Sequence, residues 1–259
     1  MDKERLKKII DDPDYIPGIY NYCDGWCERC TMTSKCSNYA LEKEYFPNDE
    51  SKDINNQKFW DRISDMFRIT LEMLEETAGE RGIDLDSIDN TVIEERRLIK
   101  EEAGEKGCVV MAKRYGKDVK LWFEASEDLL KQKEEILNSH LEMELPGTHP
   151  EKEAAGIKEV IDVILWYQHQ IYVKLMRAVT DKLDGFQDGI EDMPKDHNGS
   201  AKVALLGIDR SIAAWGTMLQ QFPEKENSIL DILVLLERIR KKTETFFPDA
   251  RSFKRPGFD

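Results

Sequence analysis

Four of the five cysteines of this chain lie within fourteen residues, at Cys23, Cys27, Cys30 and Cys36. A secreted protein that depends on disulfides usually spreads its cysteines along the whole chain. In a reducing compartment a tight group of thiols is better explained by metal, because neighbouring thiolates can share one cation without strained loops. The cluster therefore predicts a metal site. Cys108 lies alone in an apolar context, which favours a small buried side chain.

The spacing, Cys-x3-Cys-x2-Cys-x5-Cys, also bears on which metal is bound. A common zinc finger joins two cysteine pairs that are a dozen or more residues apart, and this sequence has no such gap. A [4Fe–4S] cubane presents its irons in several directions, so one short loop can wrap round it and supply every ligand. We therefore favour a [4Fe–4S] cluster slightly over Zn, and both stay open.

Two parts of the cysteine loop resemble known iron-sulfur loops. The segment Cys27-x2-Cys30-x5-Cys36 is similar to the cluster loop of endonuclease III-type DNA glycosylases, and Cys23-x3-Cys27-x2-Cys30 resembles the cysteine triplet of radical-SAM enzymes. Each resemblance covers fewer than twenty residues and implies that the spacing can hold a cubane. The remaining sequence has neither the helix-hairpin-helix of the first family nor the α/β pattern of the second.

Residues 1–45 form a predicted module of their own. Their hydrophobic period is poor, so this segment can bury little apolar area, and metal ligation is the usual means of holding such a loop. From about residue 55 the pattern becomes helical. The predicted helices span residues 55–78, 91–103, 108–140, 151–184 and 201–222, with a last one starting near 228, whereas 185–199 reads as a long loop.

Together these segments predict an all-α fold. Residues 55–259 would form an up-and-down bundle of five to six helices, with the cysteine module packed on one end. The first of these helices should bury one face, made of Phe59, Ile63, Met66, Phe67, Thr70, Leu74 and Ala78. The helix over 151–184 is apolar on two sides, which predicts a central place in the bundle.

Charge and hydropathy exclude several kinds of partner. The chain has 38 basic and 52 acidic residues, a net charge of -14, so nucleic acid and anionic membrane surfaces would be repelled. No apolar run is long enough to span a bilayer, and the N-terminus lacks the apolar stretch of a secretory signal. We therefore expect a cytoplasmic protein whose partner is another protein or a small molecule.

Six ionisable residues on apolar helix faces form a candidate pocket between the fourth and fifth predicted helices. We expect Lys202, Asp209 and at least one of the residues on the fourth helix to be buried and mutually hydrogen-bonded, because an unpaired buried charge is costly. A structural ion pair is the competing explanation. The six residues are Glu159, Asp162 and His169 on the fourth helix and Lys202, Asp209 and Arg210 on the fifth.

No catalytic signature accompanies these residues. The sequence has no Glu-x-x-His of a di-iron bundle, no HExxH, and no nucleotide-binding or hydrolase motif. The favoured function is therefore an interaction or regulatory role, in which the metal organises the N-terminal module. The alternative is an iron-sulfur or metal-dependent enzyme, or an electron carrier, acting on a small molecule in the candidate pocket.

Overall fold

The computed structural model describes residues 3–85, 90–143, 147–185 and 196–259. Within these ranges the regular elements are all helices, which confirms the predicted all-α class. The chain divides into two compact units. The N-terminal unit comprises Met1–Arg97 together with Lys254–Asp259, and the C-terminal unit comprises Leu98–Phe253. The predicted module of residues 1–45 is thus one part of the N-terminal unit.

The N-terminal unit contains four α-helices and three short 3-10 turns among its described residues, followed by α5 (Asn90–Glu105), which continues into the C-terminal unit. The α-helices are α1 (Lys3–Ile10), α2 (Ser37–Tyr45), α3 (Asp49–Lys52) and α4 (Gln57–Glu80). The 3-10 turns span Ile19–Tyr22, Cys27–Arg29 and Thr33–Lys35.

A small apolar core joins α1, α2 and α4. It consists of Leu6, Tyr45 and Ile69, with partly buried side chains packed round them. The predicted inner face of α4 is therefore partly wrong, since Phe67 is 66% exposed and Leu74 is 52% exposed. The helix has two apolar stripes, and the one that packs against α1 and α2 contains Met66, Ile69 and Met73. Periodicity alone does not tell which stripe is covered.

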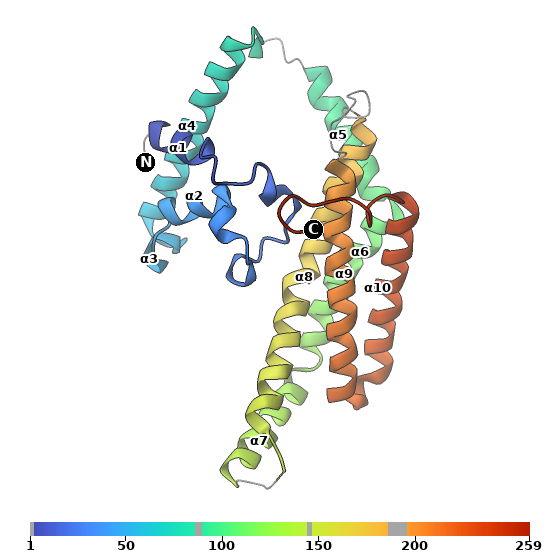
Figure 1. Cartoon of the computed structure of the whole chain (residues 1–259). Coiled ribbons are helices and arrows are strands. Elements are labelled where there is room, and N and C mark those ends of the chain that lie inside the picture. The colour runs from blue at the N-terminus through green and yellow to red at the C-terminus, as the bar shows by residue number, and fades with distance from the viewer. Residues whose placement is uncertain (1–2, 86–89, 144–146, 186–195) are drawn as a thin grey trace. The chain divides into compact units, whose positions relative to one another are not determined.

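The C-terminal unit is built on four long helices. They are α6 (Gly107–Glu124), α8 (Pro150–Asp184), α9 (Asp196–Gln221) and α10 (Glu226–Phe246). They pack in a closed ring, in which α6 contacts α8, α8 contacts α9, α9 contacts α10 and α10 contacts α6 (Figure 1). The shorter α7 (Glu127–Glu142) packs on α8.

The most enclosed helix of this unit is α9. Its buried Trp215 lies edge-on to Trp122, with ring centroids 5.0 Å apart, and its indole N–H donates to the Tyr115 hydroxyl at 3.1 Å. A Cβ added at Gly207 would lie 2.8 Å from the ring of Tyr167, so a glycine there lets α9 approach α8 closely. The predicted central helix, α8, instead leaves its second apolar side exposed, including Leu165 and Val173.

Two further predictions differ from the structure. The helix expected over 108–140 breaks at Ala125 and Ser126 into α6 and α7, and α7 buries Leu137. Helix α9 begins at Asp196, inside the loop predicted for 185–199, while residues 186–195 lie outside the described part of the chain. Among the described helices, none combines the length and the apolar character needed to cross a bilayer.

Candidate metal centre

Short 3-10 turns position the four cysteines. Cys23 follows the first turn, Cys27 opens the second, Cys30 closes it, and Cys36 lies between the third turn and α2. Each thiol is therefore at a point where the backbone changes direction. Gly25, with φ +72°, adopts the left-handed conformation between the first two cysteines, where another residue would be strained.

Backbone hydrogen bonds hold this loop, and it buries very little apolar surface. The Ile16 N–H donates to the Lys35 carbonyl at 3.0 Å and ties the start of the loop to its end. Between residues 11 and 44, Ile19 is the only buried side chain, at 1% exposure. The prediction that this segment has little to bury is confirmed.

All four cysteines line one pocket. The cavity volume of this pocket is about 20 Å³, the pocket is partly open to solvent, and each thiol residue is half-buried. The other lining residues are mostly aromatic or aliphatic: Ile19, Tyr20, Asp24, Gly25, Trp26, Met32, Thr33, Tyr39 and Phe258. Among the described residues, however, no three His, Cys, Asp or Glu side chains are arranged to hold one metal ion. The thiols thus surround a common space without meeting at a point.

Two of the sulfurs make hydrogen bonds to the backbone. The Met32 N–H donates to Cys30 Sγ at 3.3 Å, and the Cys23 thiol donates to the Tyr20 carbonyl at 3.3 Å. An N–H that points at sulfur stabilises a thiolate, and such bonds also set the potential of iron-sulfur clusters. The loop around Cys30 therefore already provides one interaction that a metal-bound thiolate uses.

The electrostatics of the pocket favour a protonated thiol at Cys27. Burial raises the pKa of Cys27 to about 11, and Glu42 and the other three cysteines add to the effect because each negative charge opposes another. A bound cation reverses this preference, since it attracts thiolates and displaces their protons. Metal binding at this site would therefore release protons.

Four aromatic residues line the pocket, namely Tyr20, Trp26, Tyr39 and Phe258. Trp26 and Tyr39, adjacent in sequence to the cysteines, line it, and the Arg29 guanidinium stacks 3.8 Å from the centroid of the Trp26 ring. Sequence reasoning missed Tyr20 and, much further along the chain, Phe258. No spacing rule links a residue near position 258 to a loop over 23–36, so only the folded chain reveals it.

The second predicted site is not assembled as expected. Glu159 and His169 are exposed, so neither supplies the buried partner expected from the fourth predicted helix. Asp162 is half-buried and pairs with Lys158 at 2.8 Å along α8. The half-buried Lys202 donates to the Phe253 carbonyl at 2.6 Å, and the exposed Arg210 donates to the Tyr167 hydroxyl.

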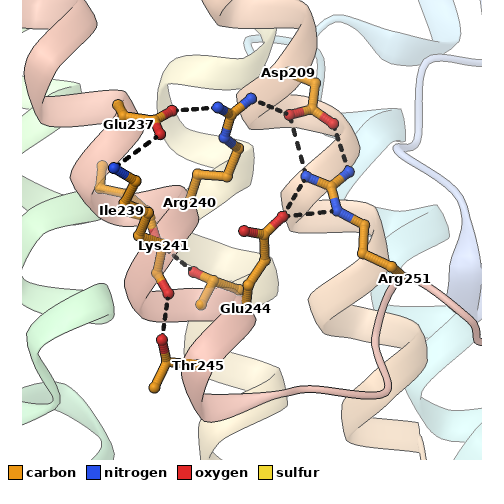
Figure 2. Close-up of polar contacts among 9 residues, drawn as sticks. Asp209, Glu237, Ile239, Arg240, Lys241, Glu244, Thr245 and Arg251 are labelled. Carbon is orange, nitrogen blue, oxygen red and sulfur yellow. Dashed lines mark hydrogen bonds and ion pairs between the residues drawn. The ribbon is translucent and has the colours of Figure 1, made fainter.

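Asp209 belongs to an ion-pair network at the end of α10 (Figure 2). Its carboxylate contacts Arg251 at 2.5 Å and Arg240 at 3.5 Å. Glu244 contacts the same Arg251 at 2.9 Å, and Glu237 contacts Arg240 at 2.5 Å. These side chains are about one-third to two-fifths exposed, so the network fastens the segment after α10 to α9 and α10. The structural ion pair weighed for these helices is the better description of Asp209.

Cys108 lies apart from this chemistry. Its side chain is 3% exposed in the C-terminal unit, and burial raises its pKa, as expected for an inert thiol. Comparisons of the chain with protein-family models, with curated proteins and with solved structures give no match. The chemistry of the cysteine pocket therefore has to be argued from its own residues.

Proposed function

We propose that Cys23, Cys27, Cys30 and Cys36 bind a [4Fe–4S] cluster that organises the N-terminal module. The observation that supports this proposal best is that the four thiols line a single pocket. Thiolate is the ligand that iron-sulfur clusters and zinc share, so the donor set fits a metal centre of either kind.

The arrangement of the thiols supports the larger centre. In a tetrahedral zinc site, all four sulfurs lie about 2.3 Å from one ion. Here no three potential ligands among the described residues are grouped for one ion, and the wall of the pocket is mostly aromatic or aliphatic. A cubane is bound by sulfurs that stand further apart, and the aromatic and aliphatic lining would shield it from water. Zn remains the competing occupant.

The metal centre is proposed to serve an interaction or regulatory role. The candidate groups on α8 and α9 that could have been catalytic are exposed or held in ion pairs and hydrogen bonds. Meanwhile α4 exposes a contiguous apolar stripe, in which Trp60, Phe67, Leu71 and Leu74 are each more than half exposed. Exposed apolar patches of this kind are typical of protein–protein contact. We therefore expect the partner to be a protein.

A second role, as an electron carrier or an enzyme on a small molecule, has one observation in its favour. The thiols are only half-buried, and the pocket is partly open, so a cluster there would lie near solvent and within reach of a redox partner. This role requires a centre that changes oxidation state reversibly, which an organising centre does not need.

Metal and sulfide analysis of the full chain, purified without oxygen, tests the proposal. We expect brown protein with iron and acid-labile sulfide in equal amounts, lost in Cys27→Ser and kept in the control Cys108→Ser. One zinc per chain without iron would overturn the cluster, and two disulfides among the four cysteines would overturn the metal site. A redox titration then separates the two roles, because reversible reduction favours the electron carrier.

A further inference from the structure

Residues Lys254–Asp259 belong to the N-terminal unit, although almost all of that unit comes from the first 97 residues. Phe258 in this segment lines the same pocket as the four cysteines. A residue contributed from so far along the chain is not needed to close a local cysteine loop. Its presence in the pocket wall therefore needs a separate explanation.

Close packing places this segment on the cysteine loop. Gly257 has φ +77°, in the left-handed region that favours glycine. A Cβ built there would lie 2.8 Å from Ile16 Cδ1, 2.9 Å from Ile19 Cδ1 and 3.1 Å from Met32 Cε. The backbone thus touches the loop where Ile19, the one buried side chain of residues 11–44, lies. A larger residue at 257 would push the segment away.

A local ion pair fixes the conformation on both sides of Phe258. The Arg255 side chain donates to the Asp259 carboxylate through Nη2 at 2.9 Å and through Nε at 3.1 Å, and its backbone N–H donates to the same group at 3.0 Å. The two side chains are 16% and 18% exposed, and the guanidinium lies 5.0 Å from the Phe258 ring centroid. This bidentate pair turns the chain so that the ring is held in one place.

We propose that Phe258 is a positioning residue that completes the wall of the cysteine pocket and slows the loss of its metal. The apolar shell round a metal controls the access of water, oxygen and chelators. Three aromatic residues of the shell come from the cysteine loop and α2, and Phe258 supplies the fourth. The inference rests on the proposed function to the extent that a metal must be bound.

The test compares Phe258→Ala and Phe258→Leu with the wild-type chain and with Phe67→Ala, a control that truncates an exposed phenylalanine of the same unit. All four proteins are loaded with iron and sulfide without oxygen, and the loss of iron is then followed in air with EDTA. We expect equal loading, loss about tenfold faster in Phe258→Ala, partial rescue by leucine, and no change in Phe67→Ala. Equal rates in Phe258→Ala and wild type would overturn the inference.

A second measurement does not depend on metal. In the metal-free chain, iodoacetamide should alkylate the four loop cysteines faster in Phe258→Ala than in wild type, because the pocket has lost one wall. An unchanged alkylation rate would show that Phe258 does not cover the pocket. If the wild-type chain takes up no metal, the proposed function fails, and the alkylation rates still decide whether Phe258 covers the thiols.

Discussion

The cysteine loop and the C-terminal unit are stabilised by different means. In the C-terminal unit, buried apolar side chains recur at helical spacing on α6, α8, α9 and α10, and each helix packs against two others of the ring. In residues 11–44, one side chain is buried. Apolar side chains at helical spacing therefore account for the stability of the C-terminal unit, whereas the cysteine loop needs another source of stability.

Magnitudes indicate which source is large enough. Ordering one residue costs about 1–2 kcal/mol of backbone entropy, so a loop of this length cannot be held by one isoleucine and a few backbone hydrogen bonds. Structural metal binding by cysteine-rich modules contributes about 10–16 kcal/mol. Within the described loop, the proposed metal binding by the four thiols that line one pocket is the only source of a stabilising free energy of that size.

The largest expected effect comes from removing two ligands at once. Cys27→Ser combined with Cys30→Ser should abolish metal binding and make residues 1–45 sensitive to protease, while helical circular dichroism stays nearly intact. The reason is that α6, α8, α9 and α10 bury apolar side chains against one another, whereas residues 1–45 pack on α4 through a small apolar core. Limited proteolysis with mass spectrometry measures this. Global unfolding of the double variant would show that the loop is part of the main core.

Two glycines on α9 test how the C-terminal unit is stabilised by packing. Gly207→Ala should destabilise the C-terminal unit by about 1–3 kcal/mol, because its Cβ would meet the buried Tyr167 ring at 2.8 Å. Gly216→Ala is the matched control, since a Cβ there meets nothing within 4 Å, and it should stabilise by about 0.5–1 kcal/mol. Denaturant unfolding reports both, and metal content should be unchanged. Equal effects of the two substitutions would contradict the close contact of α8 and α9.

The ion-pair network should contribute less. Asp209→Asn removes the partner that Arg251 and Arg240 share, and we expect a loss of about 1 kcal/mol or less, since all three side chains are partly exposed. Asp118→Asn, which breaks only the pair with Arg114 within α6, should cost still less. High salt should shrink the difference between Asp209→Asn and wild type. A loss that is large and insensitive to salt would assign Asp209 a role beyond these pairs.

The smallest effect concerns the pH dependence of the C-terminal unit. Burial raises the pKa of Asp181 above its ordinary value of 3.8, the Asp196 charge adds to the rise, and His197 and Arg177 oppose it. A raised pKa means that the contribution of Asp181 to stability is complete below pH 3.8 and is lost as pH rises through the folded-state pKa. Asp181→Asn should lack this loss, so its stability relative to wild type should increase from acidic to neutral pH. A pH-independent difference in urea midpoints would contradict the raised pKa.

Much of the helical architecture follows from the sequence, because one apolar stripe per helix is enough to predict a helix and its approximate ends. The bounds of α4, α5 and α8 agree closely with the predicted ranges. Two choices could not be made that way. The first is which of the two apolar stripes on α4 is covered. The second is the break between α6 and α7, because no proline or glycine next to Ser126 marks it in the sequence.

The candidate site shows the same division between local and distant information. The spacing of the four cysteines predicts a common metal site. The four residues line one pocket, but no three potential ligands among the described residues are grouped to hold one ion. Phe258 could not be predicted, because its contact depends on how the chain returns to the first unit. In the second candidate site, Glu159 and His169 are exposed, because apolar neighbours in the sequence do not imply that a side chain points inward.

Hydrogen exchange of the full chain, with and without bound metal, measures whether the cysteine loop depends on its ligands. We expect metal removal to raise exchange across residues 11–45 and to leave the slow amides of α8, α9 and α10 unchanged, because only the cysteine loop is proposed to depend on metal. Equal protection of the amides of residues 11–45 from exchange in the two states would contradict this expectation, because the loop would then be stable without bound metal.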